Sequence, residues 1–171
     1  VLYTYGGLQA QPLAGGQLRF GNSVDAFCDI VSLSEKAMAA LPADTCIGIA
    51  PHSLRATSES DLRQALDLHA GMPVHMHIAE QTKEVEEVAA IRGARPVEWV
   101  LGQCEVNEQW CLIHATHMTE GETAALAKSG AVAGLCPITE ANLGDGIFNG
   151  ANYVAHGGTF GIGSDLSLIH I

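Results

Sequence analysis

The sequence predicts an α/β fold built on a parallel sheet, and two patterns carry that prediction. Short apolar runs rich in Val, Ile and Leu alternate with longer segments whose apolar residues recur with the period of a helix. From residue 46 onward, successive runs start 21 to 37 residues apart, which is the length of a strand, a helix and their loops. This alternation is typical of parallel strands joined by right-handed crossovers, in a doubly wound sheet or a closed barrel.

Each apolar run is too short for a helix and is expected to form a strand. The six runs are 1–5, 46–50, 73–79, 110–114, 131–136 and 159–163. None is followed by a glycine-rich G-x-G-x-x-G turn that opens a helix, so the sequence lacks the fingerprint of a dinucleotide-binding Rossmann domain.

Helices are expected between these runs. Apolar residues at 24, 27, 28 and 31 mark the first, and positions 62, 65, 66 and 69 repeat that stripe behind a cap at Ser58. A third helix is expected near Val85 and a short fourth at Pro96. Thr119 and Glu122 form a capping-box pattern ahead of a fifth.

Composition narrows the class of protein. Eight Lys and Arg against 19 Asp and Glu give a formal charge of −11, which argues against nucleic acid or an anionic membrane as partner. The five cysteines form no C-x-x-C pair, which is typical of a reducing compartment. No window reaches the length of a membrane span, and no signal-peptide pattern opens the chain, so we expect a cytoplasmic protein.

Polar residues gather where the apolar runs end. They are His52 and Arg55 after the second run, His75, His77 and Glu80 at the third, His114 at the fourth, Glu140 after the fifth and Asp165 after the last. In a (β/α)₈ barrel the active site is built at that end of the strands. The sequence therefore predicts one pocket shared by these strand ends.

The predicted pocket has the residue types of a divalent metal site. Imidazole and carboxylate ligands suit zinc or a similar ion. His77 is placed to bind the metal, while Glu80 could take a proton from the attacking water. His75 lies two residues before His77 and hence on the same side of the strand, so spacing alone leaves the choice between the two histidines open.

Each candidate also has a structural interpretation. A strand histidine such as His77 is more often a hydrogen-bonded core residue than a ligand, and Asp165 could cap a turn. Arg55 could be a surface charge, and Glu80 could open a helix. We interpret His69 as a packing residue and Cys136 as buried. Glu84, Glu86 and Glu87 are interpreted as a solvated helix face.

Five segments together resemble one known family. The segments are APHSLR at 50–55, HMHIAEQTKEV at 75–85, RPVEW at 95–99, HATH at 114–117 and CPITEANLGDG at 136–146. They are similar to the formimidoylglutamate deiminases of the amidohydrolase superfamily, and the resemblance covers residues 1–165. It implies a distorted (β/α)₈ barrel that contains a metal-dependent hydrolase.

The resemblance also implies roles for individual residues. His77 becomes a metal ligand from the fifth barrel strand and Asp165 a ligand from the eighth. Glu80 and His114 become proton-transfer residues, with Asp165 helping to steady the tetrahedral intermediate. His52 and Arg55 are expected to bind the glutamate part of the substrate, which makes chemical sense because a guanidinium matches a carboxylate.

The implied reaction is hydrolysis of N-formimino-L-glutamate to N-formyl-L-glutamate and ammonia, a step of histidine degradation, with one divalent ion, zinc by expectation. The alternatives are a deaminase or chlorohydrolase of the same superfamily acting on a purine-like or triazine ring, and a non-enzymatic acidic binding domain. Expected partners are the small-molecule substrate and, when full length, a second copy in a homodimer, with neither nucleic acid nor membrane.

The same resemblance predicts where the barrel stands in the chain. The family's first-strand His-x-His pair and a second-strand tyrosine would precede Val1, so we expect residues 1–165 to run from about strand three to strand eight and to be inactive alone. Residues 166–171 depart from the family pattern and are expected to be a non-native tail, which removes His170 from the site.

Overall fold

The computed structural model describes residues 1–8 and 10–165. Within it the chain forms two compact units, which divide between Met76 and His77 and are described separately below. The tail predicted at 166–171 lies outside the described residues. The single domain expected over residues 1–165 stays a prediction.

The first unit is built around two helices that pack together. The short 3₁₀ helix η1 (Gly15–Arg19) precedes α1 (Val24–Met38), and α2 (Glu59–Leu68) follows a long connection. Ser58 caps α2 as predicted, because its hydroxyl accepts a hydrogen bond from the Asp61 amide. His69 is buried and meets the Phe27 ring edge-on, which confirms its role in packing.

The first two expected strands form only isolated parallel bridges. Leu2 pairs with Pro51, and Ile49 pairs with Val74. Proline has no N–H to donate to a neighbouring strand, so Pro51 and Pro73 interrupt the ladders that longer strands would need. The predicted order of these segments is retained, but their regular pairing is shorter than expected.

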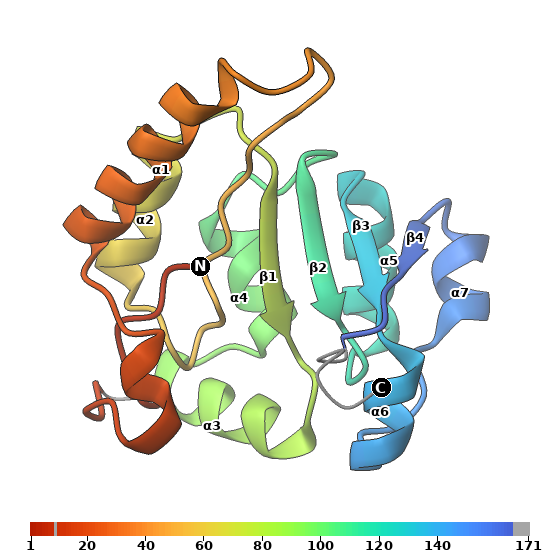
Figure 1. The fold of residues 1–171 in the computed structure, drawn as a ribbon. Coiled ribbons are helices and arrows are strands. Elements are labelled where there is room, and N and C mark those ends of the chain that lie inside the picture. Colours follow the sequence, from red (N-terminus) through yellow and green to blue (C-terminus); the bar gives the residue numbers. More distant parts are fainter. Residues whose placement is uncertain (9, 166–171) are drawn as a thin grey trace. The chain divides into compact units, whose positions relative to one another are not determined.

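A parallel sheet forms the centre of the second unit. Its strands are β1 (Val74–Ile78), which crosses the division between the units, β2 (Trp110–His114), β3 (Val132–Leu135) and β4 (Thr159–Ile162), in that spatial order. The pairs β2–β3 and β3–β4 are parallel, as predicted, and Figure 1 shows these strands side by side. At the end of β1, the amides of Ala115 and His117 donate hydrogen bonds to the carbonyls of Ile78 and Ala79.

Helices connect these strands in the expected alternation. They are α3 (Thr82–Arg92), α4 (Pro96–Gln103), α5 (Glu120–Ser129), α6 (Pro137–Leu143) and α7 (Gly150–Ala155). The capping box predicted at the start of α5 is present, because Thr119 and Glu122 each accept a hydrogen bond from the backbone amide of the other. Among the described residues, no helix combines the length and apolar character that crossing a membrane requires.

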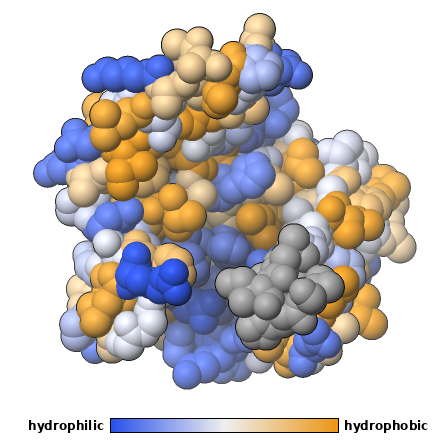
Figure 2. Space-filling model, viewed as in Figure 1, coloured by the Kyte–Doolittle hydropathy of each residue, from blue (hydrophilic) through white to orange (hydrophobic). Residues whose placement is uncertain are grey.

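Buried residues of the strands and of α7 contribute to the core of the second unit. Leu112 and Ala133 are fully buried in β2 and β3, and Tyr153 of α7 is fully buried and donates a hydrogen bond to the carbonyl of Ala131. By contrast, every residue of β4 is exposed, including Phe160 and Ile162. Apolar patches are visible where β4 and α7 meet the surface (Figure 2).

Candidate active site

Four consecutive strands of the second unit each bring a polar residue to the same end of the sheet. His77 is the second-last residue of β1 and Glu80 follows that strand, while His114 is the last residue of β2. Cys136 comes directly after β3, and Asp165 lies three residues beyond β4. Because the strands are parallel, their carboxyl ends meet at one edge, as the sequence predicted.

The imidazole of His114 is the centre of this group. It is 1% exposed, and its Nε2 lies 3.6 Å from Oε1 of Glu80 and 3.8 Å from Oδ2 of Asp165. The ring of His77 stacks on it with centroids 5.5 Å apart. The other three residues predicted as catalytic or metal-binding in this unit therefore surround the buried ring of His114.

Residues in the left-handed backbone region lie at or next to these side chains. Ala79, His114, Ala115 and Asp165 all have φ between 48° and 70°, a region that non-glycine residues seldom adopt. Each such residue costs about 1–3 kcal/mol and persists only where the surroundings enforce it, often at functional sites. Three of the four strand ends thus carry strained turns next to the side chains that converge.

A buried carboxylate holds the turn after β1. Glu84 is 1% exposed, and its two oxygens accept hydrogen bonds from the amides of Ala79 and Glu80 at 3.2 and 3.0 Å. The prediction that Glu84 lies on a solvated face was wrong, because its position in the first turn of α3 directs it back to those amides. Glu80 is therefore fixed through its own backbone.

Glu140, one of the polar residues expected at the strand ends, also contacts His114. One of its oxygens, Oε1, accepts from the Cys136 amide at 2.9 Å and lies 3.2 Å from Nδ1 of His114. The side chain is buried, in the first turn of α6. A carboxylate four residues after a strand-end cysteine is the sequence signal that points to it.

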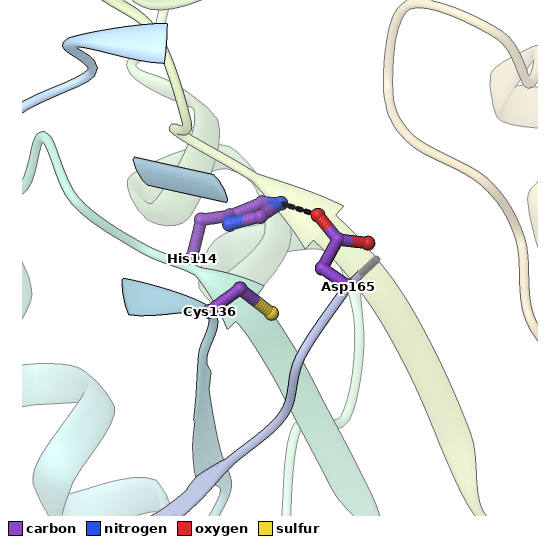
Figure 3. A group of neighbouring side chains, drawn as sticks. All are labelled: His114, Cys136 and Asp165. Carbon is purple, nitrogen blue, oxygen red and sulfur yellow. Dashed lines mark ion pairs between the residues drawn. The ribbon is translucent and has the colours of Figure 1, made fainter. Parts of the chain in front are cut away.

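The donor atoms around His114 fit a divalent ion of the zinc type. One ligand atom each of His114, Cys136 and Asp165 lie within 4.8 Å of one another, and Figure 3 shows the His114 and Asp165 side chains pointing toward each other. Nitrogen, sulfur and carboxylate oxygen are the ligands that zinc takes. Burial, aided by Asp165 and Glu140, raises the pKa of the Cys136 thiol to about 11.

The two strand histidines differ in exposure and in contacts. Val74, Met76 and Ile78 are buried, so His75 and His77 point to the opposite side of β1. His75 is exposed, whereas His77 stacks on His114. The packing favours His77 as the member of the pair that reaches the group.

The predicted substrate-binding residues lie in the first unit. His52 makes a hydrogen bond to the Ser53 hydroxyl at 3.1 Å and meets Tyr3 edge-on with centroids 4.6 Å apart. Arg55 is half-buried in the turn that follows, between the buried residues Leu54 and Ala56. Their role toward a substrate stays a prediction.

Sequence and structure comparisons place this arrangement in a family. The model of the amidohydrolase family matches residues 34–170. The chain belongs to the amidohydrolase family. It is 46% identical over 166 residues to the formimidoylglutamate deiminase of Pseudomonas aeruginosa, a match that covers 96% of this chain and 36% of that enzyme.

Two solved structures extend the likeness. An amidohydrolase from Brucella melitensis superposes with a TM-score of 0.91 at 48% identity, covering 96% of this chain and 36% of the other. A zinc-bound adenosine deaminase from Xanthomonas campestris superposes with a TM-score of 0.68 at 25% identity, covering 80% and 32%. The chain thus spans about a third of the length of these relatives.

The comparisons confirm two of the predictions. The resemblance to formimidoylglutamate deiminases is confirmed, and so is the α/β fold of the amidohydrolase barrel type. The roles assigned to His52, Arg55, His77, Glu80, His114 and Asp165 stay predictions at this point.

Proposed function

We propose that the whole protein hydrolyses N-formimino-L-glutamate to N-formyl-L-glutamate and ammonia. The observation that supports this most directly is the convergence of Glu80 and Asp165 on Nε2 of one buried histidine, His114. Hydrolysis of an amidine needs a group that moves a proton from water to nitrogen and groups that stabilise the tetrahedral carbon. The 46% identity to a formimidoylglutamate deiminase supports the choice of this substrate.

Glu80 is the proton carrier in this proposal. Its carboxylate takes one proton from the attacking water and delivers it to the imino nitrogen. It then moves the hydroxyl proton of the tetrahedral intermediate to the same nitrogen, so that the C–N bond breaks, the carbonyl forms and ammonia leaves. Glu84 holds the backbone of Glu80 in place, because its oxygens bind the amides of Ala79 and Glu80. A carboxylate held in this way keeps its distance to the reacting atoms through both transfers.

His114 and Asp165 stabilise the intermediate. Both present polar atoms toward the space that Glu80 also faces, and Nε2 of His114 accepts a hydrogen bond from the hydroxyl group that forms on the tetrahedral carbon. His114 is almost fully buried, which strengthens this interaction relative to water.

A divalent ion, zinc in our proposal, would be held by His77 and Asp165. When bound, such an ion lowers the pKa of a water and polarises the atom under attack. Asp165 also belongs to the group of three donor residues, with His114 and Cys136, whose ligand atoms lie within 4.8 Å of one another. Zinc bound to the Xanthomonas adenosine deaminase supports the choice of metal.

Arg55 and His52 bind the carboxylates of the glutamate part in this proposal. A guanidinium forms paired hydrogen bonds with a carboxylate, and the substrate carries two carboxylates. The acidic chain offers few other cations for this purpose, since only eight of its 171 residues are Lys or Arg. We further propose that the protein works in the cytoplasm, in histidine degradation, as a homodimer.

The test is ammonia release by the purified whole protein, loaded with zinc, from N-formimino-L-glutamate and from adenosine. We expect turnover of the first, a loss of at least 100-fold in kcat for Glu80→Gln, and a large rise in KM for Arg55→Ala. Arg63→Ala is the matched control, because Arg63 pairs with Glu59 on the exposed face of α2. Turnover of adenosine alone would refute the substrate assignment and favour a ring deaminase.

A further inference from the structure

We propose that Glu140 is a positioning residue that sets the orientation of the His114 ring and the nitrogen that carries its hydrogen. The inference rests on the proposed function for its catalytic consequence, but its physical content concerns only a contact between two side chains. Nδ1 of His114 lies 3.2 Å from Oε1 of Glu140, on the side of the ring away from Nε2.

The surroundings of Glu140 leave its carboxylate little freedom. The side chain is 7% exposed, and the oxygen that faces His114 also accepts the Cys136 amide at 2.9 Å. Asp145 donates its amide to the Glu140 carbonyl, so the backbone of Glu140 is tied to the following loop as well. Because strand end, helix start and loop all fix Glu140, its carboxylate is a rigid reference for the imidazole.

A carboxylate at Nδ1 decides how His114 can act. The carboxylate is an acceptor, so Nδ1 must carry the hydrogen in this contact, and Nε2 becomes the nitrogen that meets the reacting groups. Nε2 is the atom that faces both Glu80 and Asp165. Without Glu140 the ring could exchange its tautomers or rotate, and the proportion of molecules with Nε2 ready for reaction would fall.

A purely structural role for Glu140 makes a different prediction. In that case the carboxylate would serve only to cap α6 through the Cys136 amide, and its loss would lower stability without altering His114. Glu122 provides the matched comparison, since it is also buried and also caps a helix, through the Thr119 amide, but bonds to Arg95 and not to a site histidine.

The first readout is independent of metal and substrate. In metal-free whole protein labelled with ¹⁵N-histidine, the His114 signals, assigned by their loss in His114→Gln, should show a hydrogen on Nδ1. We expect Glu140→Gln to keep this pattern, because its amide oxygen can replace Oε1 as acceptor. Glu140→Ala and the similarly long Glu140→Met should produce a mixture of tautomers, whereas Glu122→Ala should not.

The second readout is the split between kcat and KM in the zinc-loaded protein. Partners that orient metal-ligating histidines typically contribute 10- to 100-fold to metal affinity or activity, and we use this range for the partner that orients His114. We expect a fall in kcat of about that size for Glu140→Met, a nearly unchanged KM, and recovery of most activity in Glu140→Gln. Glu122→Ala should lower stability and leave kcat unchanged.

The outcomes separate this inference from the proposed function. Wild-type His114 signals in both folded Glu140→Met and Glu140→Ala would overturn it, as would a wild-type spectrum with the hydrogen on Nε2. If the wild-type protein shows the Nδ1 pattern and the variants lose it, but no substrate is turned over, the positioning role stands and the proposed reaction fails.

Discussion

The carboxylate of Glu84 closes the turn that delivers Glu80, and its removal tests how the site is held. Its two oxygens each take one backbone amide, and the side chain is 1% exposed. A hydrogen bond to a charged group contributes about 1.5–3 kcal/mol, so Glu84→Ala should cost about 3 kcal/mol or more. Glu84→Gln should cost roughly half as much, because its NH₂ group faces one of the two amides as a second donor.

Hydrogen exchange and urea unfolding of the whole protein measure this loss. Amides in the segment 79–84 should exchange faster in both variants, since the local opening free energy falls. The urea midpoint should fall in the order wild type, Glu84→Gln, Glu84→Ala. Glu86→Gln is the control, because Glu86 is exposed on the same helix and its substitution should change stability by less than about 0.5 kcal/mol.

One result would refute the reasoning. If exchange at residues 79–84 and the midpoint are the same in wild type and Glu84→Ala, the carboxylate does not hold the turn. The assignment of Glu84 as the residue that holds the backbone of Glu80 would then lose its basis as well.

Three further substitutions test a buried hydrogen bond, a close contact and a helix cap in the second unit. Tyr153→Phe removes the buried hydrogen bond to the Ala131 carbonyl and should cost about 1–2 kcal/mol in urea unfolding. Gly158→Ala places a methyl group 2.4 Å from the ring of Tyr153 and should lower stability by about 1–3 kcal/mol, seen as a lower thermal midpoint. Thr119→Ala removes the cap of α5 and should cost about 1 kcal/mol, whereas Thr119→Ser should restore it.

Strand order and helix positions were predictable because they depend on local periodicity. The stripe at 24, 27, 28 and 31 coincides with the start of α1, and the caps at Ser58 and Thr119 begin α2 and α5 as expected. The site followed from a second regularity, since polar residues after parallel strands meet at one edge. Both features can be derived from spacing alone.

Burial of single charged residues was not predictable in the same way. The sequence pattern places Glu84 on a solvated helix face, whereas it assigns Glu122 to the capping box ahead of α5. Whether such a residue faces solvent or its own backbone depends on the turn that precedes the helix, and on how close the next strand lies. The turn after β1 contains Ala79 in the left-handed region. Glycine is the usual residue there, so the sequence gives no signal for this turn.

The buried glutamates share one design. Glu84, Glu122 and Glu140 each lie in the first turn of a helix that follows a strand or its loop, and each accepts the amide of a residue three or four positions earlier. The amide that Glu84 accepts belongs to Glu80, and the amide that Glu140 accepts belongs to Cys136. The same oxygen of Glu140 also lies 3.2 Å from Nδ1 of His114. Two of the three helix starts therefore serve the site directly, because one carboxylate can both cap a helix and fix the residue that a strand delivers.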